Sequence, residues 1–562
     1  MWHNWLCGRI IIHMSKPSNH LQSQNGLLPY LPVLLAVLIM LPRLISPQFG
    51  LMDDGKSVIT AQQILGGEWG FPFDTYDARF RPVYWLAFTL VYWLAGAQPF
   101  WFFLGNTLLF ALTVFCLVRF LLNTGASRLQ AGLSGLLFAL APPIVENYYT
   151  LSKGEAGQVL FLGLSLLIIS RYIRARSRAA RMLLILLSAA AVLLAAMCKE
   201  ISIITPGIAA VWWLARRVAL RRQVDRSALA PYRAWFLASA AAAIVYLLLR
   251  TTLVMGALQT QGYTSRFVFT VEQVVSGIIR WTGWLVRNFA WLAPLTAGVL
   301  LLWIFRRKPS GEKWIFESLT WAAAWIAVFL PWNLMTEYYM LPAALGLAAL
   351  GGALLVHLLA GLKDRSIWLR GASLLALAIT ALLFAINCLA GITDARIQLA
   401  VDRANRDMMD TLAETAPSGA IVLVNIREVN EYVDQMNWQL PAIYNRPDLQ
   451  VKPYDPARVG EPGTYFILQP EIRSQPLMTV RLGVVEATQD AWNTGLQADR
   501  AALPWLHETA VIGQQFRHFH VDLPRLLCPL MKTRSFCASS SPLVDTRPFS
   551  YRWTIYRGEV KP

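Results

Sequence analysis

The chain has 562 residues, of which 56% are hydrophobic and 15% charged, and 22 are tryptophan. Soluble domains contain roughly half apolar and a quarter charged residues, so the composition excludes an ordinary soluble protein. The net charge of +17 would suit a nucleic-acid-binding protein. However, the arginines cluster in short segments between long apolar blocks, which is how membrane proteins fix their orientation. We therefore predict an integral membrane protein with no nucleic-acid partner.

Eleven apolar blocks approach the roughly 20 residues that a spanning helix needs. The first block is too long for a signal-peptide core and lacks a small-residue cleavage site, so we expect it to remain as a span. The predicted spans are about 28–47, 99–122, 129–146, 156–172, 182–198, 201–215, 234–250, 288–305, 314–333, 339–361 and 371–392. The fifth and sixth are short and are joined by Lys199-Glu200. They form either a tight hairpin or one broken helix.

The loops between these spans separate by charge. Four loops hold 18 Lys and Arg residues against three acids, and these are 171–181, 216–233, 306–313 and 363–370. Positively charged loops stay on the cytoplasmic side, and so does the N-terminal segment 1–27 on this topology. An odd number of spans then places the C-terminal part outside. We expect a multi-pass protein of the inner or plasma membrane.

Two apolar segments fit neither a span nor a loop. Residues 81–98 and 271–288 are rich in Trp and Tyr and carry Arg near their ends. Aromatic side chains of this kind favour the membrane–water interface, where one part of the ring is wet. We predict interfacial helices on the outer face.

The composition changes after the last span. The sequence from 394 onward indicates a charged helix, a Pro/Gly turn and β-strands. We therefore predict a helical transmembrane domain at 28–393 and an extracytoplasmic α/β or α+β domain at 394–562. Cys528 and Cys537 would form a disulfide in an oxidising compartment, and two free thiols are the alternative.

Ionisable residues recur at the outer ends of the spans. Asp53 and Asp54 directly follow the first span, where they form either a solvated helix exit or a working site. The other candidates in the outer loops are Arg81, Glu146, Lys153, Lys199, Glu200 and Glu337. Charged groups near a membrane are usually placed for function. Their concentration on one face predicts a shared polar cavity.

Five segments in the same order resemble the GT-C class of membrane glycosyltransferases, most closely the transmembrane O-mannosyltransferases that carry tetratricopeptide repeats. They are "MDD", "FRPVYWLAFTLVYWLAGAQPFWFFLGNTLLFAL", "PPIVENYYTLSKGE", "AMCKEISIITPG" and "EYYMLPAALG". The chain departs from that subfamily because it lacks the repeats after the last span. Tyr338 also replaces the arginine of an "ER" motif, and Ser152-Lys153 replaces "sgR". These departures leave the sugar and the acceptor open.

The resemblance implies transfer of a sugar from a polyprenyl-phosphate carrier to a hydroxyl of a protein, lipid or glycan. Such a reaction needs a base for the acceptor proton and positive charge for the leaving phosphate. The first acid of the pair, Asp53, is then the catalytic base, with Asp54 as an orienting or metal-binding partner. A divalent metal ion is possible, with Asp54 and Glu146 as ligands.

The remaining candidates have simpler alternatives. Arg81, Lys153 and Lys199 would bind the carrier phosphate, but Lys199 also suits a charged hairpin tip. Glu146 would serve the acceptor or a metal, or would pair with Lys153. Glu337 suits a structural link between two spans better than a ligand. A lipid-linked sugar transporter or a non-catalytic factor for envelope polysaccharide assembly would also need a polar cavity.

Overall fold

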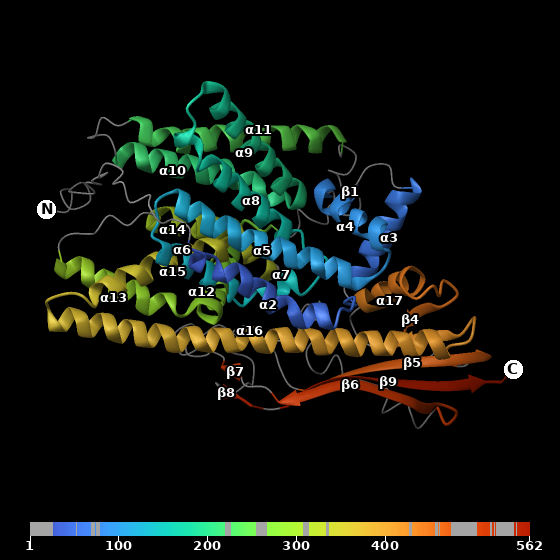
Figure 1. Ribbon diagram of the computed structural model, residues 1–562. Helices are drawn as coiled ribbons and strands as arrows, with labels where there is room; N and C mark the ends of the chain where they lie inside the picture. Colours follow the sequence, from blue (N-terminus) through green and yellow to red (C-terminus); the bar gives the residue numbers. More distant parts are fainter. Residues whose placement is uncertain are drawn as a thin grey trace.

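The chain folds into a helical bundle with a small C-terminal sheet packed along one long helix (Figure 1). The computed structural model describes residues 26–51, 53–68, 73–74, 79–219, 226–253, 267–306, 314–332, 337–425, 430–455, 459, 461–473, 503–517, 520–521, 523, 544–546 and 548–561. Cys528 and Cys537 lie outside these residues, so their predicted disulfide stays a prediction.

The helices of the bundle lie between residues 28 and 415. In chain order they are η1 (Leu28–Tyr30), α2 (Leu31–Ile45), α3 (Asp54–Gly66), α4 (Pro82–Ala95), α5 (Pro99–Asn123), α6 (Arg128–Ala139), α7 (Pro143–Tyr148), α8 (Glu155–Ile169), η3 (Tyr172–Arg174), α9 (Arg178–Cys198), η4 (Glu200–Ile204), α10 (Thr205–Ala219), η5 (Arg226–Leu229), α11 (Ala230–Leu253), α12 (Val271–Phe289), α13 (Leu292–Arg306), α14 (Ile315–Ala327), η7 (Glu337–Met340), α15 (Leu341–Gly361) and α16 (Ile367–Thr415). A two-stranded hairpin of β1 (Phe73–Asp74) and β2 (Arg79–Phe80) precedes α4.

Seven helices of the described chain are long and apolar enough to cross a membrane. The bent pair of α12 and α13, which meet at 88°, would add an eighth if it formed one span. The multi-pass prediction is therefore confirmed, whereas the count of eleven spans stays a prediction. The difference arises at α6, α10 and α14, which have only 12, 15 and 13 residues. The segments expected at the interface form α4 and α12; their depth in a membrane stays a prediction.

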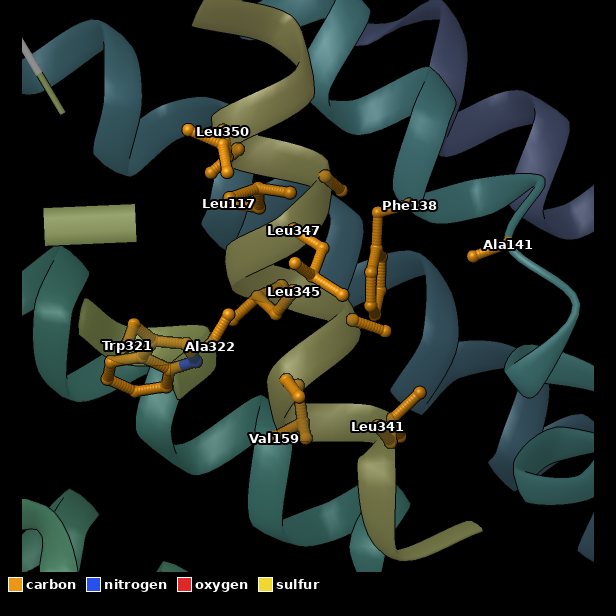
Figure 2. Packing of buried hydrophobic residues seen from close by; sticks show 14 of the residues in the cluster. Leu117, Phe138, Ala141, Val159, Trp321, Ala322, Leu341, Leu345, Leu347 and Leu350 are labelled. Carbon is orange, nitrogen blue, oxygen red and sulfur yellow. The ribbon is translucent and has the colours of Figure 1, made fainter. Parts of the chain in front are cut away.

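The bundle is organised around α15, the most buried of these helices. Its leucines pack against side chains of α5, α6, α8 and α14, as Figure 2 shows for Leu345 and Leu347 beside Phe138 and Trp321. Glycines let the neighbours come close: a Cβ at Gly352 would lie 2.1 Å from the Ser134 oxygen. Small residues at helix contacts are the usual means of close packing in membrane proteins.

The C-terminal part is built on α16, a single helix of 49 residues. At 1.5 Å per residue it is about 74 Å long, well beyond the roughly 45 Å of a whole bilayer. Its first half is apolar and its second half is charged, so the helix continues past the last predicted span. The expected boundary at 393/394 therefore lies inside one continuous helix.

A five-stranded mixed sheet covers the second half of α16 (Figure 1). Its strands lie in the order β4 (Gln450–Pro453), β3 (Ile421–Val424), β5 (Gly463–Arg473), β9 (Pro548–Val560) and β6 (His507–Arg517), and β7 (His520–Val521) pairs with β8 (Val544–Asp545) separately. The β4–β3–β5 pairings are parallel, and β9 is antiparallel to its neighbours. Asn405 of α16 accepts hydrogen bonds from Tyr551 (2.6 Å) and Trp553 (2.8 Å). The predicted helix-and-strand composition of this part is present.

The helix between β3 and β4, α17 (Asn430–Ala442), packs on α3 of the bundle. Figure 1 shows α17 next to the start of the sheet and below α3. The C-terminal part is therefore held to the bundle by α17 as well as by α16. This second attachment places it directly beside the Asp53-Asp54 segment.

Candidate functional site

The paired acids occupy a sharp connection between α2 and α3. Asp53 is the residue that precedes α3, and its backbone is left-handed, with φ 63° and ψ −18°. For a residue other than glycine this conformation costs roughly 1–2 kcal/mol. Strained residues of this kind cluster at functional sites when the surrounding structure holds them. Ser57 donates a hydrogen bond to the Asp53 carbonyl (2.9 Å), which secures the first turn of α3.

The two carboxylates have different environments. Asp53 is half-buried, whereas Asp54 is 2% exposed. The Asp54 oxygens accept hydrogen bonds from the Gly50 backbone N–H (2.7 Å) and the Ser152 hydroxyl (2.7 Å). Asp53 is therefore partly open to solvent, and Asp54 is enclosed. The alternative prediction, that the paired acids form a solvated helix exit, is therefore wrong for Asp54.

Burial raises the pKa of Asp54 to about 7, and its two hydrogen bonds oppose that shift only in part. The two charges of a nearby ion pair shift the pKa of Asp54 in opposite directions. Arg43 and Asp402 pair at 2.6 Å and are almost fully buried, and the Arg43 guanidinium also lies 4.0 Å from the Phe103 ring centre. The Asp402 charge raises the pKa of Asp54 further, and the Arg43 charge lowers it. Asp54 is thus a carboxyl that changes protonation near neutral pH.

A second charged group lies where α4 and α8 begin and α9 ends. Arg81 donates two hydrogen bonds to Glu200, at 2.6 and 2.7 Å, and Lys199 pairs with Glu155 at 2.6 Å. All four side chains are at most about a tenth exposed. Lys199 is therefore buried and is not a solvated hairpin tip. The connection that carries it is a 3₁₀ turn between α9 and α10.

The electrostatics of this group follow from its burial. Burial lowers the pKa of Lys199, and the neighbouring Arg81 charge lowers it further, against the opposing effect of Glu155. Burial would raise the pKa of Glu200, but the charge and hydrogen bonds of Arg81 hold it well below its usual range. Removing one partner of such a buried pair strands the other charge, which typically costs about 3–5 kcal/mol.

Lys153 completes the cationic side of the site. It is half-buried, and its ammonium lies 4.2 Å from the Tyr338 ring centre. Lys199 lies over the same aromatic pair, 4.4 Å from the Tyr339 ring centre. Within the described part of the chain, Lys153 has no carboxylate at ion-pair distance. The alternative pairing of Lys153 with Glu146 is therefore wrong.

Tyr84 connects the two charged groups. Burial raises the pKa of the Tyr84 phenol, a hydrogen bond with Ser57 lowers it, and the charges of Asp53, Asp54 and Arg81 all act on it. Its ring also lies near the turn that begins α8, because a Cβ at position 154 would be 3.9 Å from the Tyr84 ring. Ser152, which donates a hydrogen bond to Asp54, also directly precedes Lys153 in the chain. The paired acids and the cationic group therefore lie next to each other.

The structure assembles most of the predicted residues. Asp53, Asp54, Arg81, Lys153, Lys199 and Glu200 lie in the two linked groups described above. Glu146 is half-buried on α7, which packs against η7 near Tyr338. The Glu337 side chain lies outside the described residues.

The described residues contain no cluster of three or more His, Cys, Asp or Glu side chains that could hold a metal ion. Both Asp54 oxygens also already accept hydrogen bonds from within the chain. A divalent metal ion with Asp54 and Glu146 as ligands therefore stays a prediction.

The sequence analysis missed several residues of the site. Glu155 follows Lys153 closely in the chain, and an acid at the start of an apolar span was a signal that could have identified it. Arg43 and Asp402 are 359 positions apart, and Tyr84 is one of many aromatic residues in an apolar segment. No local pattern could have brought these three to the site.

No sequence profile of a known family matches the chain, and no curated protein is similar in sequence. Several solved structures are similar in overall arrangement. ArnT from Cupriavidus metallidurans in the apo state is 14% identical with a TM-score of 0.48, covering 93% of this chain and 97% of that one. ArnT bound to undecaprenyl phosphate is 14% identical with a TM-score of 0.46, covering 81% of this chain and 94% of that one. A third similar structure is the oligosaccharyltransferase AglB from Archaeoglobus fulgidus, in complex with an inhibitory peptide and a dolichol-phosphate. It is 13% identical with a TM-score of 0.43, covering 77% of this chain and 65% of that one.

Proposed function

We propose that this protein is a GT-C-type membrane glycosyltransferase that moves a sugar from a polyprenyl-phosphate carrier to a hydroxyl acceptor on the outer face. The observation that carries the proposal is one site that contains a half-buried carboxylate, Asp53, and a cationic group formed by the buried Arg81 and Lys199 and the half-buried Lys153. Glycosyl transfer from a lipid phosphate requires both a proton acceptor and positive charge for the departing phosphate.

Asp53 is the general base of the proposed reaction. The acceptor oxygen forms a bond to the anomeric carbon and gives its proton to the Asp53 carboxylate. The bond between the anomeric carbon and the phosphate oxygen breaks, and polyprenyl phosphate leaves with that electron pair. Asp53 suits this role better than Asp54 because it is only half-buried, whereas Asp54 is fully buried and held by its hydrogen bonds. Asp54 then orients the segment that carries Asp53.

The cationic group binds the carrier phosphate. Arg81 is paired with Glu200 and Lys199 with Glu155, whereas the Lys153 ammonium lies over the Tyr338 ring. Lys153 is the cation available to the phosphate because no carboxylate among the described residues pairs with it. Arg81 and Lys199 keep their own partners, so they act chiefly through the field at the site. No step of the proposed reaction is assigned to a metal ion.

The orientation that we propose is the one predicted from the positively charged loops. The Arg-rich loops and the N-terminus lie in the cytoplasm, while the Asp53 segment and the sheet face the outer side. Because α17 packs on α3, both belong to the same side of the bundle. The acceptor is a hydroxyl of a protein, lipid or glycan, and it would approach Asp53 from that side.

The proposal is tested with the Asp53→Asn variant, which keeps the size of the side chain and removes the base. Transfer from a polyprenyl-phosphate sugar should fall by about 10²–10⁴-fold, the usual contribution of general-base catalysis. Asp54→Asn should cost less. Full transfer activity in Asp53→Asn would contradict the assignment. Wild-type protein that moves a lipid-linked sugar across liposomes without transferring it would favour a transporter instead.

A further inference from the structure

The C-terminal part contacts the proposed base directly. Gln435 of α17 accepts a hydrogen bond from the Asp53 backbone N–H at 2.7 Å through Oε1. Its Nε2 donates to the Asp53 carboxylate oxygen Oδ1 at 3.3 Å. Gln435 is 4% exposed and is 382 positions away from Asp53 in the chain. One buried amide thus holds both the backbone and the side chain of the left-handed residue.

A second glutamine supports the same segment one helical turn later. Gln439 donates from Nε2 to the Gly50 carbonyl at 2.7 Å and to the Leu51 carbonyl at 3.3 Å, and it is 3% exposed. Residues four apart lie on the same face of a helix, so α17 presents both amides to this segment. A Cβ at Gly55 would lie 2.6 Å from the Gln439 Cγ, so α17 and α3 approach closely there.

These contacts differ from ordinary packing between two parts of a chain. They are directed at backbone groups of the connection between α2 and α3 and at the Asp53 carboxylate. A single amide supplies both the acceptor and the donor that Asp53 requires. The left-handed backbone of Asp53 is the conformation that such external hydrogen bonds can maintain.

We propose that Gln435 is a positioning residue for the catalytic base, with Gln439 holding the preceding residues, so that the outer domain completes the active site of the membrane domain. This inference rests on the proposed function for its catalytic part. The outer domain is then needed for the chemical step even when the acceptor is small. Its contribution is the orientation of Asp53.

The structural part is tested by hydrogen–deuterium exchange of the full-length protein, measured on peptides that cover residues 50–57. Gln435→Ala should raise exchange there, because the Asp53 N–H loses its buried acceptor. Asn437→Ala is the matched control: Asn437 lies on the same helix and also makes two amide hydrogen bonds, to the Val451 N–H (2.8 Å) and carbonyl (2.9 Å). Unchanged exchange in Gln435→Ala, or an equal rise in Asn437→Ala, would overturn the proposed support.

The catalytic part is tested by transfer kinetics of the same two variants. Misplacing a catalytic group by about 1 Å can cost on the order of 100-fold, so Gln435→Ala should lower kcat by about 10- to 100-fold with little change in KM for the carrier. Asn437→Ala should keep kcat near that of the wild type. Equal losses of kcat in the two variants would reduce Gln435 to a stability role.

Gln435→Glu separates positioning from stability by a pH profile. The new carboxylate can still accept from the Asp53 N–H, but it places a like charge beside the base. A like charge disfavours the ionised form of a carboxylate, so the acid limb of the pH–rate profile should move up by about one unit. An unmoved limb would contradict the contact with the base. Wild-type protein without any transfer activity would refute the proposed function, whereas the exchange result would still test the support of Asp53.

Discussion

Asp54 gives the most quantitative prediction, because its burial makes folding depend on pH. Its pKa rises from 3.8 to about 7 in the folded protein. Between these values the folded state binds more protons than the unfolded state, so stability falls as the pH rises. The carboxyl is neutral and unpenalised at low pH. Above pH 7 it carries a buried charge that the two hydrogen bonds and Arg43 offset only in part.

The size of the effect follows from the two pKa values. Ionisation of Asp54 should lower the free energy of unfolding by about 2 kcal/mol between pH 5 and pH 7. At pH 7 the total loss, relative to a protein with neutral Asp54 at low pH, should be about 4 kcal/mol. Asp54→Asn cannot ionise, but it can accept only one of the two hydrogen bonds, which costs about 1 kcal/mol. The variant should therefore be about 2–3 kcal/mol more stable than the wild type at pH 7.

The assay is thermal or denaturant unfolding of both proteins in detergent across pH 5–8. The wild type should lose stability with rising pH relative to Asp54→Asn, and the difference between them isolates Asp54 from the seven histidines. Glu200 does not interfere, because a lowered carboxyl pKa contributes stability that is already complete above about pH 4.5. Parallel pH dependences of the two proteins would refute the reasoning.

Three further predictions concern the site, the orientation and the C-terminal cysteines. Lys153→Ala should raise KM or Kd for the carrier without lowering the Tm much, whereas Arg81→Ala should lower the Tm as well, since it leaves a buried carboxylate unpaired at a cost of about 3–5 kcal/mol. Equal Tm losses in the two variants would contradict this. A cysteine at Ser418, which is exposed at the end of α16, should react with an impermeant thiol reagent in intact cells; labelling only after lysis would reverse the orientation. Cys528 and Cys537 should become alkylated only after reduction, and free alkylation of both in denatured, unreduced protein would exclude the disulfide.

The sequence was sufficient to predict that this is a multi-pass membrane protein and to locate most of its long helices. Uninterrupted apolar blocks such as 99–122 contain all the information that a spanning helix requires, because the bilayer sets its length. The shorter blocks alone do not determine which helices they form. Block 129–146 contains Pro142 and Pro143, and the structure divides it into α6 and α7. Whether such short helices cross a membrane depends on their neighbours, which periodicity does not reveal.

The charged residues of the site could be predicted, but their partners could not. Arg81, Lys199 and Glu200 stand out because ionisable residues concentrate on the outer side of the predicted spans. Arg81 pairs with Glu200, 119 positions later in the chain, because α4 packs beside the end of α9. The contact of Gln435 with Asp53 was even less visible, since a polar residue on a helix of a soluble domain is an ordinary surface residue until that helix has docked.

The continuity of α16 has a mechanical consequence for the chain. A helix without a break transmits rotation, so each residue inserted between its apolar and charged halves would turn the attached sheet by about 100° and move it by 1.5 Å. Asp402 would then leave Arg43, and α17 would leave α3. The number of residues between the apolar half of α16 and Asp402 is therefore fixed by geometry.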